Sequence, residues 1–179
     1  MERIAGLLGD SVRCTSSYGQ LTVDVPREQW LTAVRTVRDD LGLTFFDLLT
    51  AVDEQAAGFD VVLRLWSASE RFALLMRTRC PRDDAQVPSL SGIFAGAAWH
   101  ERQVHEMFDI GFDGHPGLTP LLLPDGFEGH PLRKEFLLAS RVESPWPGAK
   151  DPGESDADLA AAAPRRRKNL PFGVPRDAP

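Results

Sequence analysis

The sequence predicts an α+β domain, in which a mixed sheet of about four strands is packed with helices and followed by a long extended C-terminal arm. Two observations lead to this prediction. Short apolar segments of strand-like composition occur in the first half, without the strict strand–helix alternation of a doubly wound sheet. A helix-like segment then runs into a stretch rich in Gly and Pro with little periodicity. We expect one domain over residues 1–140 and a separate tail over residues 141–179.

The first predicted strand contains Leu21, Val23 and Val25, which alternate with polar residues as in a half-buried strand. Pro26 then stands where a helix can begin, because its missing N–H is no loss at the first helical position. Apolar residues follow at helical spacing, and Gly42 is a natural end for the helix. These apolar residues are Trp30, Leu31, Val34, Val37 and Leu41.

Three further strands are predicted at Thr44–Val52, Val61–Trp66 and Phe72–Arg77. A short polar segment separates the last two, which indicates a hairpin. After them, Pro88 and Ser89 open a second helical region, and the Ser89 hydroxyl is able to cap it.

The second helix carries a carboxylate on its apolar face. That face contains Ile93, Ala97, Val104 and Phe108, and Glu101 falls on it between Ala97 and Val104. A charge among apolar side chains is costly unless it is paired, so we expect a cationic or N–H partner for Glu101. We predict an ion pair with Arg133 or Arg102 that fixes how the next loop leaves the helix, in preference to a catalytic role.

The segment from Trp99 to Phe136 is unusual for an ordinary globular domain. It contains all four histidines and two copies of Gly-His-Pro, at residues 114–116 and 129–131. Compact domains seldom keep so long an irregular segment unless it binds something. We therefore expect residues with partner-binding or structural roles in this segment, residues 99–136. The candidate residues are Glu101, Arg102, His115, Pro116, His130, Pro131, Arg133 and Lys134.

A metal site is an alternative interpretation of the histidines, but their spacing disfavours it. His100 and His105 are five positions apart, about 140° around a helix, whereas helical zinc ligands at i and i+4 share one face. His115 and His130 each lie between Gly and Pro, where an imidazole can hydrogen-bond to loop backbone. We expect histidines that organise a loop, with no metal ligand and no catalytic residue.

Composition excludes several classes of protein. A net charge of −6 argues against a nucleic-acid surface, and no window approaches the ~18 apolar residues of a membrane span. Cys14 and Cys80 cannot hold a conventional iron–sulfur cluster, which needs about four thiolates. The spacings of a nucleophile elbow and of a phosphate-binding glycine loop are both missing. We expect a soluble, intracellular binding or scaffolding module without a cofactor of its own.

The tail differs in composition from the domain. It contains a Pro/Gly-rich stretch, an acidic run, four consecutive alanines and a basic cluster at Arg165–Lys168. Such a segment cannot bury enough apolar surface to fold by itself. We expect it to be either disordered or laid on a partner as an extended arm.

The segment from Trp99 to Phe136 also carries a resemblance to a known family. The matching residues are Trp99-x-Glu101-Arg102, Met107-Phe108-x-Ile110-x-Phe112-x-Gly114-His115-Pro116-x-Leu118, Leu122-Leu123-Pro124 and Gly129-His130-Pro131-Leu132-Arg133-Lys134. This run resembles the signature of the 30-kilodalton subunit, also called the C subunit, of respiratory complex I, or NADH–quinone oxidoreductase. The resemblance covers about residues 20–140. Two arginines that commonly follow the first Gly-His-Pro-x-Leu in that family are Thr119 and Pro120 here.

This resemblance implies a non-catalytic subunit in the peripheral arm of a proton-translocating enzyme that passes electrons from NADH to quinone. The isolated chain would then have no activity, and the flavin, the iron–sulfur clusters and the sites for NADH and quinone would belong to partner subunits. The implied partners are the quinone-pocket subunit, named D in that complex, and the cluster-bearing subunit, named B, with the one named I as a further candidate. Membrane contact would come only through the complex, on the cytoplasmic side of the cell membrane.

Two alternatives remain open at this point. Energy-converting membrane hydrogenases use similar subunits, so the chain could be an accessory subunit of such an assembly. A stand-alone metalloenzyme that uses the histidine cluster is the second alternative, from a different class of function.

Overall fold

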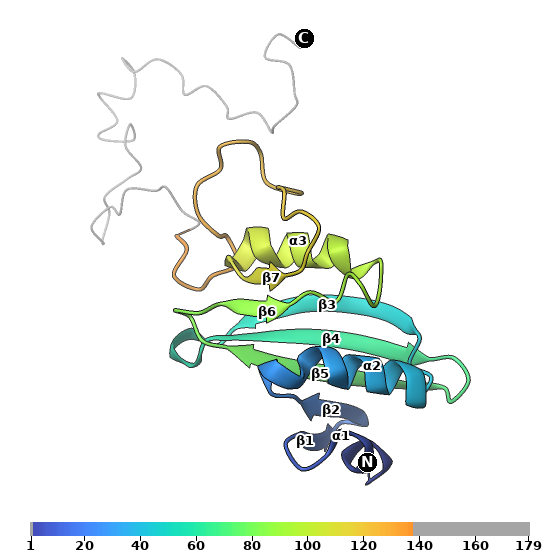
Figure 1. Ribbon diagram of the computed structural model, residues 1–179. Coiled ribbons are helices and arrows are strands. Elements are labelled where there is room, and N and C mark those ends of the chain that lie inside the picture. Colours follow the sequence, from blue (N-terminus) through green and yellow to red (C-terminus); the bar gives the residue numbers. More distant parts are fainter. Residues whose placement is uncertain (1, 138–179) are drawn as a thin grey trace, which may run out of the picture. The chain divides into compact units, whose positions relative to one another are not determined.

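The computed structural model describes residues 2–137, and the predictions for the tail lie outside this range (Figure 1). The helices are α1 (Glu2–Leu8), α2 (Trp30–Asp40) and α3 (Ala97–Phe108), with short 3₁₀ turns η1 (Arg27–Gln29) and η2 (Gln55–Ala57). The strands are β1 (Arg13–Ser17), β2 (Gln20–Asp24), β3 (Phe45–Asp53), β4 (Phe59–Ser67), β5 (Phe72–Cys80), β6 (Gln86–Pro88) and β7 (Gly111–Asp113).

Five strands form the main sheet, in the order β1-β2-β5-β4-β3. Only β2 and β5 pair in parallel, and the other three pairings are antiparallel, so the predicted mixed sheet is confirmed. The predicted hairpin is also confirmed as β4 and β5. Strand β1 was not predicted, because its sequence, RCTSS, lacks the apolar alternation that marks a half-buried strand.

Helix α2 follows the predicted strand β2 and ends before Gly42. Pro26 precedes a 3₁₀ turn, and the α-helix itself begins at Trp30. Gly42 has a φ of +65°, the left-handed conformation that favours glycine after a helix. The buried side chains of α2 are Trp30, Ala33, Val34 and Val37, and they join the core on one face of the sheet.

The two faces of the sheet differ in burial. Figure 1 shows α2 lying over one face of the sheet. On β4, Leu63 and Leu65 are fully buried in the same core cluster as the buried side chains of α2. Their neighbours Arg64 and Trp66 point to the opposite side, which we call the open face, and are only half-buried. Helix α3 lies along β3, the strand at one edge of the sheet (Figure 1).

The predicted start of the second helix was wrong. Pro88 ends β6, which pairs in parallel with β7, and the backbone N–H of Ser89 donates to the carbonyl of Asp113. Helix α3 begins only at Ala97, and Gly96 occupies the capping position without a side-chain bond. Ser89 does not cap it because its N–H continues the strand pairing and its hydroxyl is used elsewhere.

The segment after α3 is extended, as predicted, and these residues, 109–137, are called the arm from here on. Apart from the short β7, residues 109–137 contain no helix or strand. Within the described part of the chain, no helix is long and apolar enough to cross a membrane.

Gly58 is expected to be irreplaceable in the turn between β3 and β4. Its φ of +98° and ψ of −148° are nearly exclusive to glycine, and an added Cβ would collide with the carbonyl oxygen of Cys80. Gly58→Ala should lower the free energy of unfolding by about 2 kcal/mol or more in urea titrations. Gly92→Ala is the control, since nothing lies near its added Cβ, and equal losses in both variants would contradict this account of the turn.

Candidate partner-binding site

The site is built on helix α3, whose buried stripe fixes its rotation on the domain. Ala97, Glu101, Val104 and Phe108 point inward at helical spacing, as the sequence predicted for this face. Phe108 meets Phe59 of β4 edge to face, with ring centroids 6.2 Å apart. The opposite side of α3 is left for the arm.

Glu101 is fully buried, and its partners agree with the prediction only in part. One carboxylate oxygen accepts the backbone N–H of Leu90 and the other accepts the hydroxyl of Ser89, each at 2.6 Å. The expected N–H partner is therefore present, but the ion pair with Arg133 or Arg102 was wrong. Burial raises the pKa of Glu101, against the lowering effect of these two hydrogen bonds.

Arg102 instead holds the first part of the arm. Its guanidinium donates to the carbonyls of Thr119 at 2.9 Å and Pro120 at 2.7 Å. The same group lies over the ring of Trp99, with its central carbon 5.3 Å from the ring centroid. Arg102 thus fixes the backbone of the arm at Thr119 and Pro120.

Glu106 holds the next three residues, and the sequence analysis did not single it out. Its carboxylate accepts the consecutive N–H groups of Leu121, Leu122 and Leu123 at 3.1, 2.9 and 2.8 Å. Burial acts to raise the pKa of Glu106, but the three N–H donors outweigh it and hold that pKa below its ordinary value. The available signal was its spacing, since Glu106 comes four residues after Arg102 and shares its helix face.

The end of the arm satisfies the last turn of α3. The final four carbonyls of a helix have no intrahelical partner. Here the carbonyl of His105 accepts the N–H of Asp109 at 2.7 Å, and that of Glu106 accepts from Nδ1 of His130 at 3.0 Å. The carbonyl of Met107 accepts the N–H of Leu132 at 3.2 Å, and that of Phe108 accepts from Nε of Arg133 at 2.7 Å. The arm therefore completes the helix as well as resting on it.

The two Gly-His-Pro motifs contact opposite ends of α3. Gly117 donates its N–H to Nδ1 of His115, so Nε2 of that ring carries the proton and donates to the carbonyl of Ala98 in the first turn. His130 contacts the last turn, as described above. Pro116 is exposed and Pro131 half-buried, and each follows its histidine on the way out of these contacts. The arm thus retraces α3 from its first turn to its last.

Arg133 and Lys134 bring the arm to the sheet by different means. Besides capping α3, the Arg133 guanidinium lies 3.3 Å from Asp109 and stands over the Phe59 ring. Lys134 acts through its backbone N–H, which donates to the carboxylate of Asp53 at 2.8 Å, while its side chain is exposed.

Asp53, at the end of β3, is the anchor that the sequence did not reveal. Its buried carboxylate also receives Arg82 at 2.7 Å and the N–H of Gln55 at 2.7 Å, and Arg82 reaches Glu135 of the arm at 3.0 Å. Burial acts to raise the pKa of Asp53, but these N–H and guanidinium donors lower it overall. No spacing in the sequence links these residues, because they meet only in the folded chain.

The arm encloses a pocket of about 210 Å³ against α3. Leu118, Leu123 and Phe127 line it together with His105 and His130. Large apolar side chains also point outward beside it, including Trp99 and Leu122, each 62% exposed. Within residues 2–137, no group of three or more His, Cys, Asp or Glu side chains is placed to hold a metal ion. The arrangement suits recognition of a protein surface.

Two replacements of Glu101 should distinguish the effect of its hydrogen bonds on stability from the effect of its charge. Glu101→Ala leaves a cavity and two unpaired donors, and should lower the free energy of unfolding by about 3 kcal/mol. Glu101→Gln keeps an acceptor for Leu90 and should fold. Because the pKa of Glu101 is raised in the folded chain, its carboxyl group contributes to the free energy of unfolding in full below pH 4.5, the ordinary pKa. This contribution is lost as the pH rises through the pKa of the folded chain. Urea titrations across this pH range should show that component only in the wild type.

Glu106→Gln should loosen the arm without unfolding the domain. The amide group has no negative charge, and an NH2 donor takes the place of one of the two acceptor oxygens, so at least one of the three backbone N–H groups loses its acceptor. Amide exchange at Leu121–Leu123 should therefore accelerate about tenfold or more. Because the pKa of Glu106 is lowered in the folded chain, its carboxylate stabilises the arm in full above pH 4.5, the ordinary pKa. This stabilisation disappears as the pH falls through the pKa of the folded chain. Glu128→Gln, an exposed change in the same arm, is the matched control. Equal exchange in both variants would argue against the carboxylate clamp.

Comparison with known proteins agrees with this architecture. Residues 23–142 match the family model described as the respiratory-chain NADH dehydrogenase 30 kDa subunit. A relative from Bordetella petrii, named as the C subunit of NADH-quinone oxidoreductase, is 37% identical over 157 residues, covering 76% of this chain and 75% of its own. A protein of the same name from Caulobacter vibrioides is 39% identical over 145 residues, covering 79% of this chain and 71% of its own.

Two solved structures share the fold, each at 23% sequence identity. The trypsin-resistant fragment of Nqo5 aligns with a TM-score of 0.58 over 65% of this chain and 97% of its own. A chain of the membrane-bound sulfane sulfur reductase, an archaeal respiratory membrane complex, aligns with a TM-score of 0.67 over 84% of this chain and 95% of its own. From the family match and the curated relatives together, the chain belongs to the family of the 30 kDa subunit of respiratory-chain NADH dehydrogenase.

Proposed function

We propose that this chain is a non-catalytic peripheral-arm subunit of a proton-translocating NADH–quinone oxidoreductase. The observation that carries the proposal is the arm, whose backbone is fixed along α3 by Arg102, Glu106 and Arg133 while Trp99 and Leu122 face outward. A rigid backbone that displays large apolar side chains is the usual form of a stable subunit interface. The relatives named as the C subunit of NADH-quinone oxidoreductase support the choice of complex.

In this role the chain assembles with the quinone-pocket subunit (named D) and the cluster-bearing subunit (named B), with the one named I as a further neighbour. Those partners and the rest of the complex supply the flavin, the iron–sulfur clusters and the sites for NADH and quinone. This chain meets the membrane only through the complex, at its cytoplasmic side. Its contribution to electron transfer is to hold the partner subunits in fixed positions relative to one another.

The same fold supports a second candidate, an accessory subunit of a related assembly such as an energy-converting membrane hydrogenase. The likeness to a chain of the archaeal sulfane sulfur reductase favours keeping it, since that chain is part of a respiratory membrane complex without NADH in its name. A nickel-binding large subunit among the co-purifying chains would select this candidate.

Co-purification with an affinity tag on the full chain tests both candidates. The tagged protein should bring down subunits that bind NADH, flavin and iron–sulfur clusters, and the preparation should reduce quinone with NADH. The chain alone should do neither. A chain recovered in full yield without partner subunits would refute the proposal.

Arg133→Ala adds a residue-level prediction. It leaves the Phe108 carbonyl without its charged donor, a loss of about 2 kcal/mol, and should cut the yield of assembled complex about fivefold. Complex that still assembles should turn over at a near-normal rate. Arg35→Ala, an exposed change on α2, should assemble normally, and parity between the two variants would contradict the role of Arg133.

A further inference from the structure

The open face of the main sheet has an apolar end. Phe45 of β3 and Trp66 of β4 are directly opposite in the antiparallel register, and Phe45 is 57% exposed. Leu48, 39% exposed, and Leu75 lie on either side of Arg64 in the adjacent row. Three neighbouring strands thus present large apolar side chains together, a feature that marks interaction surfaces on soluble domains.

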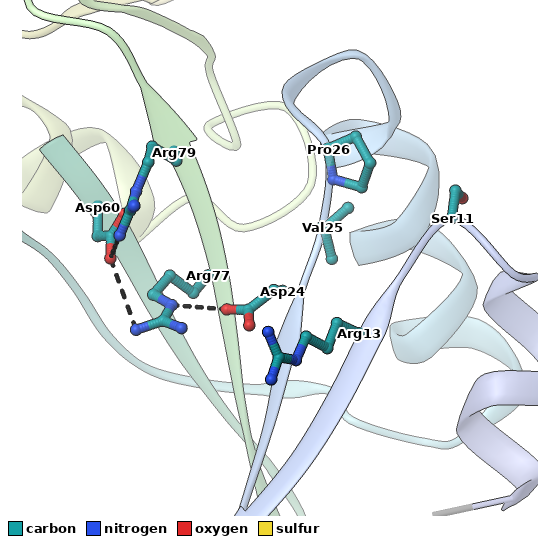
Figure 2. A pocket seen from close by; sticks show the side chains of 8 residues that line it. All are labelled: Ser11, Arg13, Asp24, Val25, Pro26, Asp60, Arg77 and Arg79. Carbon is teal, nitrogen blue, oxygen red and sulfur yellow. Dashed lines mark hydrogen bonds and ion pairs between the residues drawn. The ribbon is translucent and has the colours of Figure 1, made fainter. Parts of the chain in front are cut away.

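The other end of the open face is charged. A hollow of about 380 Å³ lies at this end. Among the side chains that line it, Figure 2 shows Arg13, Arg77 and Arg79 together with Asp24 and Asp60. Arg77 bonds Asp24 at 2.6 Å and approaches Asp60 at 3.5 Å, and Arg79 bonds Asp60 at 2.5 Å. Arg13 lies opposite Asp24 in the strand register and forms no ion pair within residues 2–137.

The charged end has an excess of positive charge, because three guanidinium groups share two carboxylates. Its sign is opposite to that of the whole chain, which carries −6. The hollow therefore fits an additional carboxylate, which could bond Arg13 without displacing either aspartate.

We propose that the open face docks one amphipathic segment of a neighbouring subunit in the oxidoreductase, with apolar side chains over Phe45 and Trp66 and a carboxylate in the arginine hollow. This inference rests on the proposed function. Arg13 lies at the level of Val62, four residues from Trp66 along the strand direction, or about 13 Å at ~3.3 Å per residue. It also lies three strands away, or about 14 Å at ~4.8 Å per strand, so the two side chains start about 20 Å apart. A docking helix would therefore carry its carboxylate about 13 residues from its apolar anchor, at ~1.5 Å per residue.

A second copy of this chain is a poorer occupant. Two copies stacked face to face about a twofold axis parallel to the strands would set arginine against arginine. An axis across the strands would set the apolar end of each copy against the charged end of the other. Both arrangements are unfavourable, whereas a segment with the complementary pattern avoids them.

Site-specific photocrosslinking in the assembled complex identifies the occupant. Phe45 is replaced by the photoreactive p-benzoylphenylalanine, and Tyr18, fully exposed in the turn between β1 and β2, is replaced in a control. Position 45 should crosslink to another subunit, in a peptide with an apolar cluster and an acidic residue, and position 18 should not. Crosslinks to a second copy, to residues 138–179 of this chain, or to nothing would overturn the inference.

Two substitutions test the two ends of the face separately. Phe45→Ser and Arg13→Glu should each reduce the yield of assembled complex about fivefold, while Tyr18→Ser should not. All three positions are exposed, so thermal unfolding of the isolated chain should change little. An arginine in place of the acidic residue found by crosslinking should restore assembly of Arg13→Glu, and failure to do so would count against the carboxylate.

Failure of the inference is distinguishable from failure of the proposed function. If wild-type protein co-purifies with the oxidoreductase but Phe45→Ser and Arg13→Glu assemble in full yield, only the docking of the open face is wrong. If wild-type protein brings down no oxidoreductase subunit, the proposed function falls and the inference falls with it.

Discussion

The last four carbonyl groups of α3, which have no partner within the helix, are the constraint on which the arm depends. A helix that ends against its own domain must find donors for its last four carbonyls. In this chain all four are supplied by residues 109–133, so the helix end and the arm are stable only together. The arm has no helix or long strand of its own, and its backbone groups likewise need partners on α3. This mutual requirement explains why an irregular segment can have one conformation.

Glu101 couples this unit to the rest of the domain from the opposite side of the helix. Its carboxylate binds the loop that follows β6, while β6 pairs with β7 at the start of the arm. The chain segments before and after α3 are therefore tied both to the helix and to each other. A carboxylate suits this position because its two oxygens can accept from a hydroxyl and a backbone N–H at once, which an apolar residue cannot do.

The sequence was informative where a single local rule decides the structure. Alternation identified the strand around Val23, and two apolar segments separated by a polar stretch identified those around Leu63 and Leu74. Gly42, with its positive φ, follows the end of α2 as expected. Glu101 was placed on the correct helix face by periodicity alone. The polar strand β1 was missed because it is specified by pairing with β2 rather than by its own side chains. The ion pair predicted for Glu101 was wrong, and Asp53 was missed, because contacts between residues distant in sequence leave no spacing that a pattern could show.

Because the arm is fastened at both ends, its surface is ordered before any partner binds. Ala98 receives His115 at the beginning, and Asp53 receives Lys134 at the end. Segments that order only on contact lose conformational entropy at that moment, which weakens affinity for a given area. Here that entropy is lost during folding of the chain itself. Association on this surface should accordingly proceed at rates typical of two preformed bodies, without a slow ordering step.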